Sequence, residues 1–129
     1  TQSPSSAASD VYKRQANVRA KKLINDSSQK ASKFSVVSEE LDNNDKKLLK
    51  SFIKFEFYFE QTIKNNEPHH LADYLYEISQ QFNGMYQGTN ILENENITLK
   101  ENKLKITDLF LEYSNLLMEC LGILPVKKM

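Results

Sequence analysis

The sequence contains few of the residues that break helices or cross-link a chain: three glycines, three prolines and a single cysteine, Cys120. One cysteine excludes a disulfide within the chain and suits a reducing compartment such as the cytosol. Because glycine and proline form most tight turns, their scarcity argues against many short strands and favours long helices. The sequence has no run of about 18 apolar residues that could cross a membrane and no secretory signal at its start. We therefore expect a cytoplasmic protein without a membrane span.

A net charge is missing as well. The chain has 17 basic and 17 acidic residues, whereas a protein that binds nucleic acid non-specifically is normally basic overall. The charge is uneven, because residues 1–33 contain seven basic and two acidic residues and carry +5, while the remainder carries −5. Any contact with RNA must therefore be local and depend on shape rather than on a general positive field.

The first fifteen residues differ from the rest. The stretch "TQSPSSAASDVYKRQ" is rich in serine and alanine, and it shows no helical spacing of apolar residues and no residue that pairs with a core. We interpret residues 1–15 as non-native, such as a cloning remnant or a translated adapter, with a natural disordered tail as the alternative. The other 114 residues, 16–129, are enough for one domain with one hydrophobic core.

Apolar residues at helical spacing predict four main helices after residue 15. They begin with residues 16–24 and continue with 44–63, 68–88 and about 102–121. The second helix is apolar around most of its circumference, so we expect it to lie centrally and to be covered on more than one side. Residues 87–101 form a long connection. The sequence therefore predicts an all-α fold, a bundle of about four main helices with one long loop.

Local signals mark the ends of these helices. Asn44 and Asp45 offer an N-cap and a first-turn acid for the second helix. Pro68 fits the first turn of the third helix, where its missing N–H costs nothing. Gly88 and Gly122 follow the third and fourth apolar stripes, where a glycine commonly ends a helix.

The residue pattern contains no recognisable catalytic or metal site. Zinc ligands on one helix are spaced three or four residues apart, whereas His69 and His70 are adjacent and point about 100° apart on a helix. No second ligand-rich motif follows them, so we interpret both histidines as the first turn of a helix. The scattered glycines form no phosphate-binding loop. Cys120 falls on the apolar stripe of the last helix, where it is interpreted as a small core residue rather than a nucleophile.

The tyrosines of the third helix allow two interpretations. Tyr74 belongs to the apolar stripe, although its hydroxyl needs a partner, whereas Tyr76 falls on the opposite face. Tyr86 lies near the helix end, beside Asn83 and Gly84. Aromatic rings that stack on unpaired bases, with amides that read base edges, are typical of single-stranded RNA recognition. Such a stripe more often belongs to a helix core than to a binding surface, so the pattern alone favours the core without excluding RNA binding.

Three blocks of sequence carry a family resemblance: "ANVRAKKL", "EPHHLADYLYEISQQFNGMYQGTNIL" and "NKLKITDLFLEYSNLLMECLGILPVKKM". In their order and separation they resemble the C-terminal, DALR-type anticodon-binding domain of arginyl-tRNA synthetases, and the resemblance covers residues 16–129. The chain departs from the family pattern at Gln15, where an aromatic residue is usual, and at Lys103, where an arginine is usual. The ending "PVKKM" also differs from the more common Pro-Glu-Arg-Met.

The resemblance implies which residues contact RNA. It implies that the small side chain of Ala16 lets a base approach closely and that Arg19 contacts a phosphate or a base edge. It implies that Asn83 and Tyr86 form the wall of a pocket by hydrogen bonding and stacking. At the chain end it implies contacts to a base or to the RNA backbone by three further residues, Lys127, Lys128 and Met129.

The resemblance also implies an intact enzyme that joins arginine to its tRNA with ATP and magnesium. The class I catalytic domain of that enzyme would lie upstream, so this chain would hold no catalytic residue, no metal ligand and no cofactor of its own. Its partners would be the anticodon loop of an arginine tRNA and its own upstream catalytic domain, and we expect a monomer.

Three alternatives compete with this interpretation. The chain could be a structural or partner-binding helical bundle with no role in RNA binding. It could be the equivalent helical domain of another aminoacyl-tRNA synthetase, either another class I enzyme such as the cysteine enzyme, or the glycine enzyme. It could also be a small metalloenzyme with a site at His69 and His70.

Overall fold

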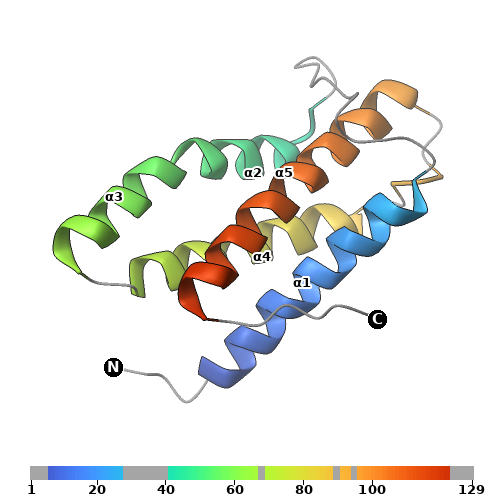
Figure 1. Cartoon of the computed structure of the whole chain (residues 1–129). Helices are drawn as coiled ribbons and strands as arrows, with labels where there is room; N and C mark the ends of the chain where they lie inside the picture. Colours follow the sequence, from blue (N-terminus) through green and yellow to red (C-terminus); the bar gives the residue numbers. More distant parts are fainter. Residues whose placement is uncertain (1–5, 28–40, 67–68, 89–90, 94–95, 123–129) are drawn as a thin grey trace.

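The fold is a bundle of helices in a computed structural model of the chain (Figure 1). The structure describes residues 6–27, 41–66, 69–88, 91–93 and 96–122. Five helices make up most of these ranges: α1 Ser6–Asp26, α2 Asn43–Ile53, α3 Phe55–Asn65, α4 His69–Gly88 and α5 Ile97–Leu121. These ranges contain no strand, and the prediction of an all-α bundle is confirmed. In the same ranges, none of the helices is long and apolar enough to cross a membrane.

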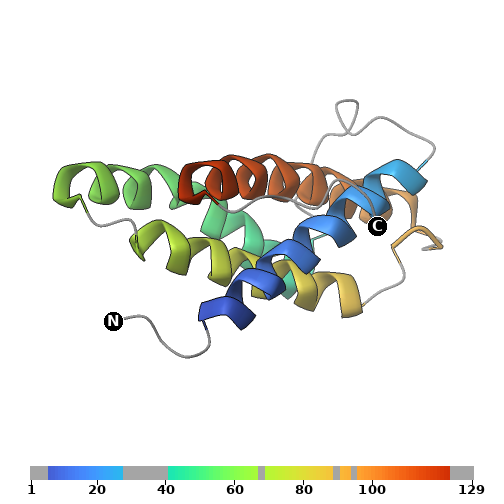
Figure 2. The ribbon, with the colours of Figure 1, turned by 60° about the horizontal axis from the view of Figure 1, so that its bottom comes forward.

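Helix α4 is the centre of the bundle and contacts each of the other four helices. Helix α1 packs against both α4 and α5 and crosses α4 at an angle (Figure 2). The apolar stripe of α4 supplies much of the core through Leu75, Ile78 and Phe82, none of which is exposed. The rings of Phe82 and Phe110 stack with centroids 4.5 Å apart and thereby join α4 to α5. The predicted stripe of the third helix is therefore the one that organises the fold.

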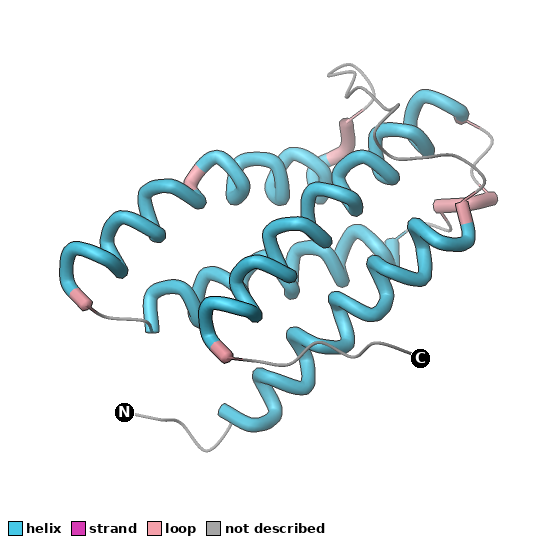
Figure 3. Tube along the Cα trace, viewed as in Figure 1, coloured by secondary structure: helices cyan, strands magenta, loops and turns pink. Residues whose placement is uncertain are grey.

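The predicted helix over residues 44–63 is two helices, because the chain breaks at Lys54 between α2 and α3 (Figure 3). The backbone N–H of Lys54 bonds to the carbonyl of Ser51 and closes the end of α2 with a tight turn. The expectation that this element lies centrally is wrong. Helix α3 contains no buried residue. Helix α4 occupies the centre of the bundle, and α3 packs against one side of α4.

Two helices begin elsewhere than the sequence indicated. Asp42 rather than Asn44 is the N-cap of α2, because its carboxylate accepts the backbone N–H of Asp45 at 2.9 Å. Helix α5 begins at Ile97 rather than near residue 102, because the side chain of Asn96 caps it through the N–H of Leu99. The connection predicted over residues 87–101 is correspondingly shorter.

The expected helix ends are found at two glycines. Helix α4 ends at Gly88. Helix α5 is followed by Gly122, whose φ of 72° is the left-handed conformation that glycine adopts easily. Pro68 lies outside the described residues, as does Pro125.

Helix α1 begins at Ser6, ten residues before the predicted start of the domain. The expectation that residues 1–15 hold no residue packed against the rest is wrong for part of this stretch. The side chain of Lys13 is only 4% exposed, and the ring of Tyr12 lies 5.5 Å from that of Tyr76 on α4. The helix continues upstream of Ala16 and meets α4 through this pair of rings. The non-native origin of residues 1–15 remains a prediction.

The interiors of α4 and α5 match the predicted stripes with two exceptions. Tyr74 is buried, and its hydroxyl donates to the backbone carbonyl of Ser51 at 2.6 Å, which supplies the partner that its burial requires. Cys120 was expected to be a small core residue but is exposed, and so is Leu116, which belongs to the same apolar stripe of the sequence. They lie in the last turns of α5, where the interior positions are filled by Leu117 and Met118.

A buried ion pair joins α5 to the start of α2. The ammonium group of Lys103 lies 2.7 Å from a carboxylate oxygen of Asp42 and 2.8 Å from one of Asp45. Lys103 is 1% exposed and Asp45 is fully buried. Burial raises the pKa of Asp45 more than Lys103 lowers it. For Asp42 burial also acts to raise the pKa, but the hydrogen bonds and charge of Lys103 and the neighbouring N–H groups lower it overall.

These two shifts have opposite effects on stability. Folding favours the ionised form of Asp42, so its contribution is present above the ordinary carboxylate pKa and is lost as the pH falls through its lower folded value. Folding disfavours the ionised form of Asp45, so protonation of this group in mild acid relieves part of its cost. One ammonium group between two carboxylates therefore holds one firmly ionised and the other less so.

We expect Lys103→Met to lower the free energy of unfolding by about 3–5 kcal/mol, because it leaves the buried carboxylate of Asp45 without a cation. Chemical denaturation monitored by circular dichroism measures the loss. Lys105→Met is the matched control on the same helix, since its ion pair with Asp108 is 4.0 Å long and partly exposed and contributes less than about 1 kcal/mol. Adding Asp45→Asn to Lys103→Met should recover part of the loss. Equal losses for Lys103→Met and Lys105→Met would contradict this account.

Candidate functional site

Three of the predicted site residues meet where α1 crosses the last turns of α4. Arg19 donates from Nη1 to the side-chain oxygen of Asn83 at 2.8 Å. The guanidinium carbon of Arg19 also lies 5.7 Å from the ring centroid of Tyr86, within the range of a cation–π contact. Because Asn83 and Tyr86 are three residues apart, they project from the same side of the helix. The structure therefore brings together residues that are more than sixty positions apart in the sequence.

Asn83 orients the arginine. Its side chain is 3% exposed, and within the described part of the chain its amide nitrogen has no hydrogen-bond partner. A buried amide donor that is left unpaired typically costs about 1–3 kcal/mol. The carbonyl end of the amide is used for Arg19, which leaves the other N–H groups of the half-buried guanidinium available for a ligand. A guanidinium held in this way suits a phosphate or the edge of a planar group.

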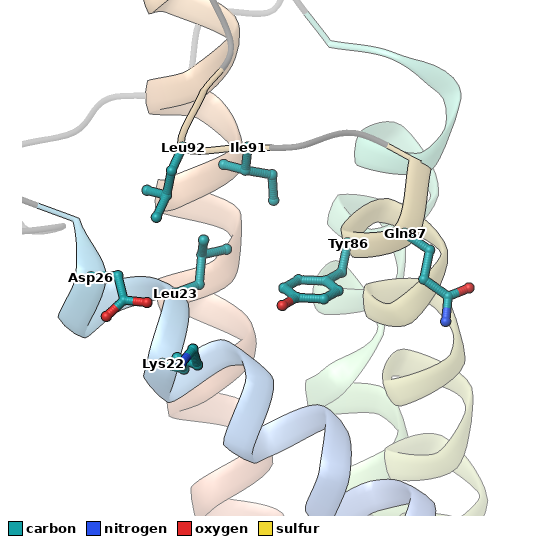
Figure 4. A pocket seen from close by; sticks show the side chains of 7 residues that line it. All are labelled: Lys22, Leu23, Asp26, Tyr86, Gln87, Ile91 and Leu92. Carbon is teal, nitrogen blue, oxygen red and sulfur yellow. The ribbon is translucent and has the colours of Figure 1, made fainter. Parts of the chain in front are cut away.

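A pocket of about 380 Å³ opens beside Tyr86 (Figure 4). The Tyr86 ring projects from α4 toward α1, with two apolar residues of the following segment nearby. The residues that line the pocket are Lys22, Leu23, Asp26, Tyr86, Gln87, Ile91 and Leu92. Its volume lies within the range of small-molecule sites. A flat group could lie against the tyrosine ring here, with lysine, aspartate and glutamine side chains at its edges.

Sequence reasoning missed the other lining residues. Lys22 lies one helical turn after Arg19 and Gln87 follows Tyr86 directly, so their spacing to predicted residues was the available signal. Ile91 and Leu92 fall in the predicted long connection and offered no such signal. Their contribution depends on how the chain turns after α4, which spacing along a helix does not encode.

Ala16 differs from its prediction. It was expected to face an RNA loop, but its side chain is fully buried. Ala16 and Ala20 lie on the inward side of α1, one helical turn apart, where their small side chains let the helix approach its neighbours. Ala16 therefore shapes the packing of α1 rather than the exposed rim. Three other predicted contacts, Lys127, Lys128 and Met129, lie outside the described residues.

A polar bridge fixes α1 against α5 below this site. Asn17 is fully buried and donates to the hydroxyl of Ser114 at 2.7 Å and to the side-chain carbonyl of Asn115 at 2.8 Å. Asn17 lies half a turn from Arg19, so the bridge fixes the rotation of α1 about its own axis. The direction in which Arg19 points is thus set from two sides, by α5 and by Asn83.

The histidine pair does not form part of this site. The rings of His69 and His70 lie 4.2 Å apart at the first residues of α4, at the end of the helix opposite to Tyr86. In the described ranges of the chain, no group of three or more histidine, cysteine, aspartate or glutamate side chains could hold a metal ion.

Comparison with known proteins gives a consistent match. Residues 10–129 match the model of the DALR anticodon binding domain family. An arginine–tRNA ligase of Pasteurella multocida is 30% identical over 119 residues, which are 92% of this chain and 21% of that protein. Those of Agathobacter rectalis and Methanopyrus kandleri are 28% and 26% identical over 81% and 88% of this chain. The chain spans about a fifth of the length of these relatives.

We expect Arg19→Met to lower the free energy of unfolding by about 1–3 kcal/mol, because it leaves the buried amide of Asn83 without any partner. Thermal unfolding followed by circular dichroism measures the change. Lys22→Met, three residues further along the same helix and exposed, is the control and should change stability by less than about 0.5 kcal/mol. Equal stability of the Arg19→Met and Lys22→Met variants would show that the hydrogen bond between Arg19 and Asn83 does not stabilise the fold.

Proposed function

The chain belongs to the DALR anticodon-binding domain family, and from that membership we propose that it binds the anticodon loop of an arginine tRNA as one domain of an arginine–tRNA ligase. The observation that carries this proposal is the meeting of Arg19, Asn83 and Tyr86 beside an open pocket. These residues combine a fixed cation, a buried amide and an aromatic ring, which are the groups that single-stranded RNA recognition uses.

Each of the three residues has a distinct role in the proposed complex. Tyr86 offers its ring to an unstacked base, a contact that needs no particular base identity. Arg19 contacts a phosphate or base edge through the N–H groups that Asn83 does not take. Asn83 acts as a positioning residue, because its carbonyl fixes the guanidinium in place.

The pocket beside Tyr86 is the proposed place for a base that is turned out of the loop. Leu23, Ile91 and Leu92 supply apolar contacts around such a base, while Lys22 and Asp26 offer a donor and an acceptor at its edge. A base held by shape and stacking requires no strong positive field. This fits a chain with a net charge of zero.

The catalytic role belongs to the proposed intact enzyme and not to this domain. We propose that arginine activation, with ATP and magnesium, takes place in an upstream catalytic domain. The anticodon-binding domain would hold the anticodon loop, so that the acceptor end of the same tRNA reaches the catalytic domain. We propose that the intact enzyme acts in the cytoplasm, as a monomer. We propose that Lys127, Lys128 and Met129 add contacts to the RNA at the chain end, and that Ala16 contributes through the packing of α1.

We expect Tyr86→Ala to weaken binding of an arginine tRNA anticodon stem-loop about 5- to 150-fold, which is the loss of about 1–3 kcal/mol of stacking on one base. Fluorescence anisotropy at low salt, with a stem-loop of unrelated anticodon as the competitor, measures the dissociation constant. Tyr76→Ala is the control on the same helix, because Tyr76 is exposed on the other face and contacts Tyr12. The Tyr76→Ala variant should bind the stem-loop with an unchanged dissociation constant. Absence of binding by the unaltered chain would overturn the proposal itself.

In the intact ligase, we expect Arg19→Ala to raise the KM for tRNA about tenfold while leaving kcat at saturating tRNA nearly unchanged, because it removes binding and not chemistry. Steady-state aminoacylation at varied tRNA concentrations separates the two constants. Lys54→Ala, on an exposed residue between α2 and α3 that does not line the pocket, is the matched loss of one positive charge. A fall in kcat alone would exclude Arg19 from tRNA binding.

A further inference from the structure

Asn83 is followed directly by Gly84, and this dipeptide carries a reactivity that RNA binding does not use. The side-chain amide of an asparagine can be attacked by the backbone nitrogen of the next residue. The reaction is fastest before a glycine, because no side chain hinders the approach of that nitrogen. Asn83 is the one asparagine of the sequence that precedes a glycine. The dipeptide therefore combines a residue of the proposed site with a potential site of chemical change.

The reaction needs only the chain itself and water. The backbone nitrogen of Gly84 forms a bond to the side-chain carbonyl carbon of Asn83 and gives up its proton. The amide nitrogen of the Asn83 side chain takes that proton and leaves as ammonia, so that a cyclic imide remains. Water then opens the ring at either of its carbonyl carbons. One opening yields aspartate, and the other yields isoaspartate, in which the main chain runs through the former side chain.

The folded chain keeps the reacting atoms apart. In a helix the N–H of residue 84 is directed toward the carbonyl four residues earlier, so ring closure requires Asn83 to leave the helical conformation. The carbonyl oxygen of the Asn83 side chain also accepts a hydrogen bond from Arg19, and the side chain is almost fully buried. Helix α4 ends at Gly88, which places Asn83 within about the last two turns. Helix ends open more readily than helix centres, so opening of α4 at this end would start the reaction.

The packing of the bundle does not require a glycine at position 84. Gly84 is exposed. A Cβ added to it would lie 3.9 Å from the side-chain oxygen of Asn44, which is an ordinary van der Waals distance. An alanine would fit here and would favour the helix. Gly84→Ala is therefore a substitution that slows ring closure and leaves the fold in place.

Both products would change the proposed RNA site. An aspartate at position 83 carries a carboxylate, which can accept two parallel N–H groups from the guanidinium of Arg19. The charge of Arg19 would then be neutralised, and fewer of its N–H groups would remain for a ligand. An isoaspartate lengthens the backbone and so would turn Tyr86 relative to α1.

We propose that Asn83–Gly84 is a self-modification site, at which opening of α4 lets the Asn83 amide convert to a carboxylate that captures Arg19. The helical conformation of α4 protects the site in the folded chain. The chemical conversion stands without the proposed function, and only its effect on RNA binding rests on that function.

The first experiment measures the conversion itself. The unaltered chain and the Gly84→Ala variant are kept at neutral pH, with and without a concentration of urea that unfolds them. Mass spectrometry with fragmentation follows the change from amide to carboxylate at position 83. We expect the unaltered chain to convert about tenfold faster or more in urea, because the folded chain must first open. In urea, Gly84→Ala should convert about tenfold more slowly or less, because its methyl group hinders ring closure.

Two results of this experiment would overturn the proposal. Equal rates with and without urea would show that α4 gives no protection. Equal rates for the unaltered chain and Gly84→Ala in urea would show that the glycine does not promote the reaction.

The second experiment measures the effect on RNA. Asn83→Asp reproduces the aspartate product, and we expect it to bind the anticodon stem-loop about tenfold more weakly, because a charge-assisted hydrogen bond from Arg19 is lost. Asn65→Asp makes the same substitution at an exposed position at the end of α3 and should leave the dissociation constant unchanged. Circular dichroism checks that both variants fold. Should Asn83→Asp not fold, the naturally converted chain, separated by ion exchange, replaces it.

The outcomes separate this inference from the proposed function. Unchanged stem-loop binding by Asn83→Asp, or by the converted chain, would overturn the capture of Arg19 and leave the RNA function intact. Conversion at position 83 without stem-loop binding by the unaltered chain would refute the RNA function and leave the chemical conversion intact.

Discussion

The ammonium group of Lys103 between Asp42 and Asp45 is the contact on which the arrangement of the other helices depends. It lies near the start of α5 and binds both acids of the capping box that begins α2. The same contact therefore holds the first turn of α2 in place and fixes α2 against α5. Because α2 leads directly into α3, the position of the exposed helix follows from it as well. A buried cation with two carboxylates also allows few alternative pairings, which favours a single register.

The proposed RNA site depends on this framework without belonging to the core. Arg19 comes from α1, and Asn83 and Tyr86 come from α4. Asn17 holds α1 against α5, and small buried alanines let α1 approach its neighbours. Arg19, Asn83 and Tyr86 lie near the ends of α1 and α4, so the geometry of these three residues is set by helices rather than by a loop. A preorganised rim reduces the entropy lost on binding. This helps to explain how a chain without net charge could hold an anionic ligand.

The sequence predicted the elements better than their arrangement. Apolar spacing identified the stripe of α4, and single glycines marked the ends of α4 and α5. Apolar spacing could not show that the helix is divided at Lys54 or that α3 lies at the outside of the bundle. The same spacing of apolar residues occurs in helices at the centre of a bundle and in helices at its surface. Burial of Ala16 was equally invisible, since only the crossing of α1 and α4 decides it. The site residues came from family resemblance, and the pocket beside them required the fold.

Helix α4 separates the two ends of the domain, and its length has a consequence for how such domains can change. Its 20 residues span about 30 Å, and each inserted or deleted residue would turn the far end by about 100°. A single insertion within α4 would rotate Tyr86 away from α1 while the histidine end stayed in place. Insertions and deletions in this architecture should therefore occur between the helices, and the length of α4 should stay constant.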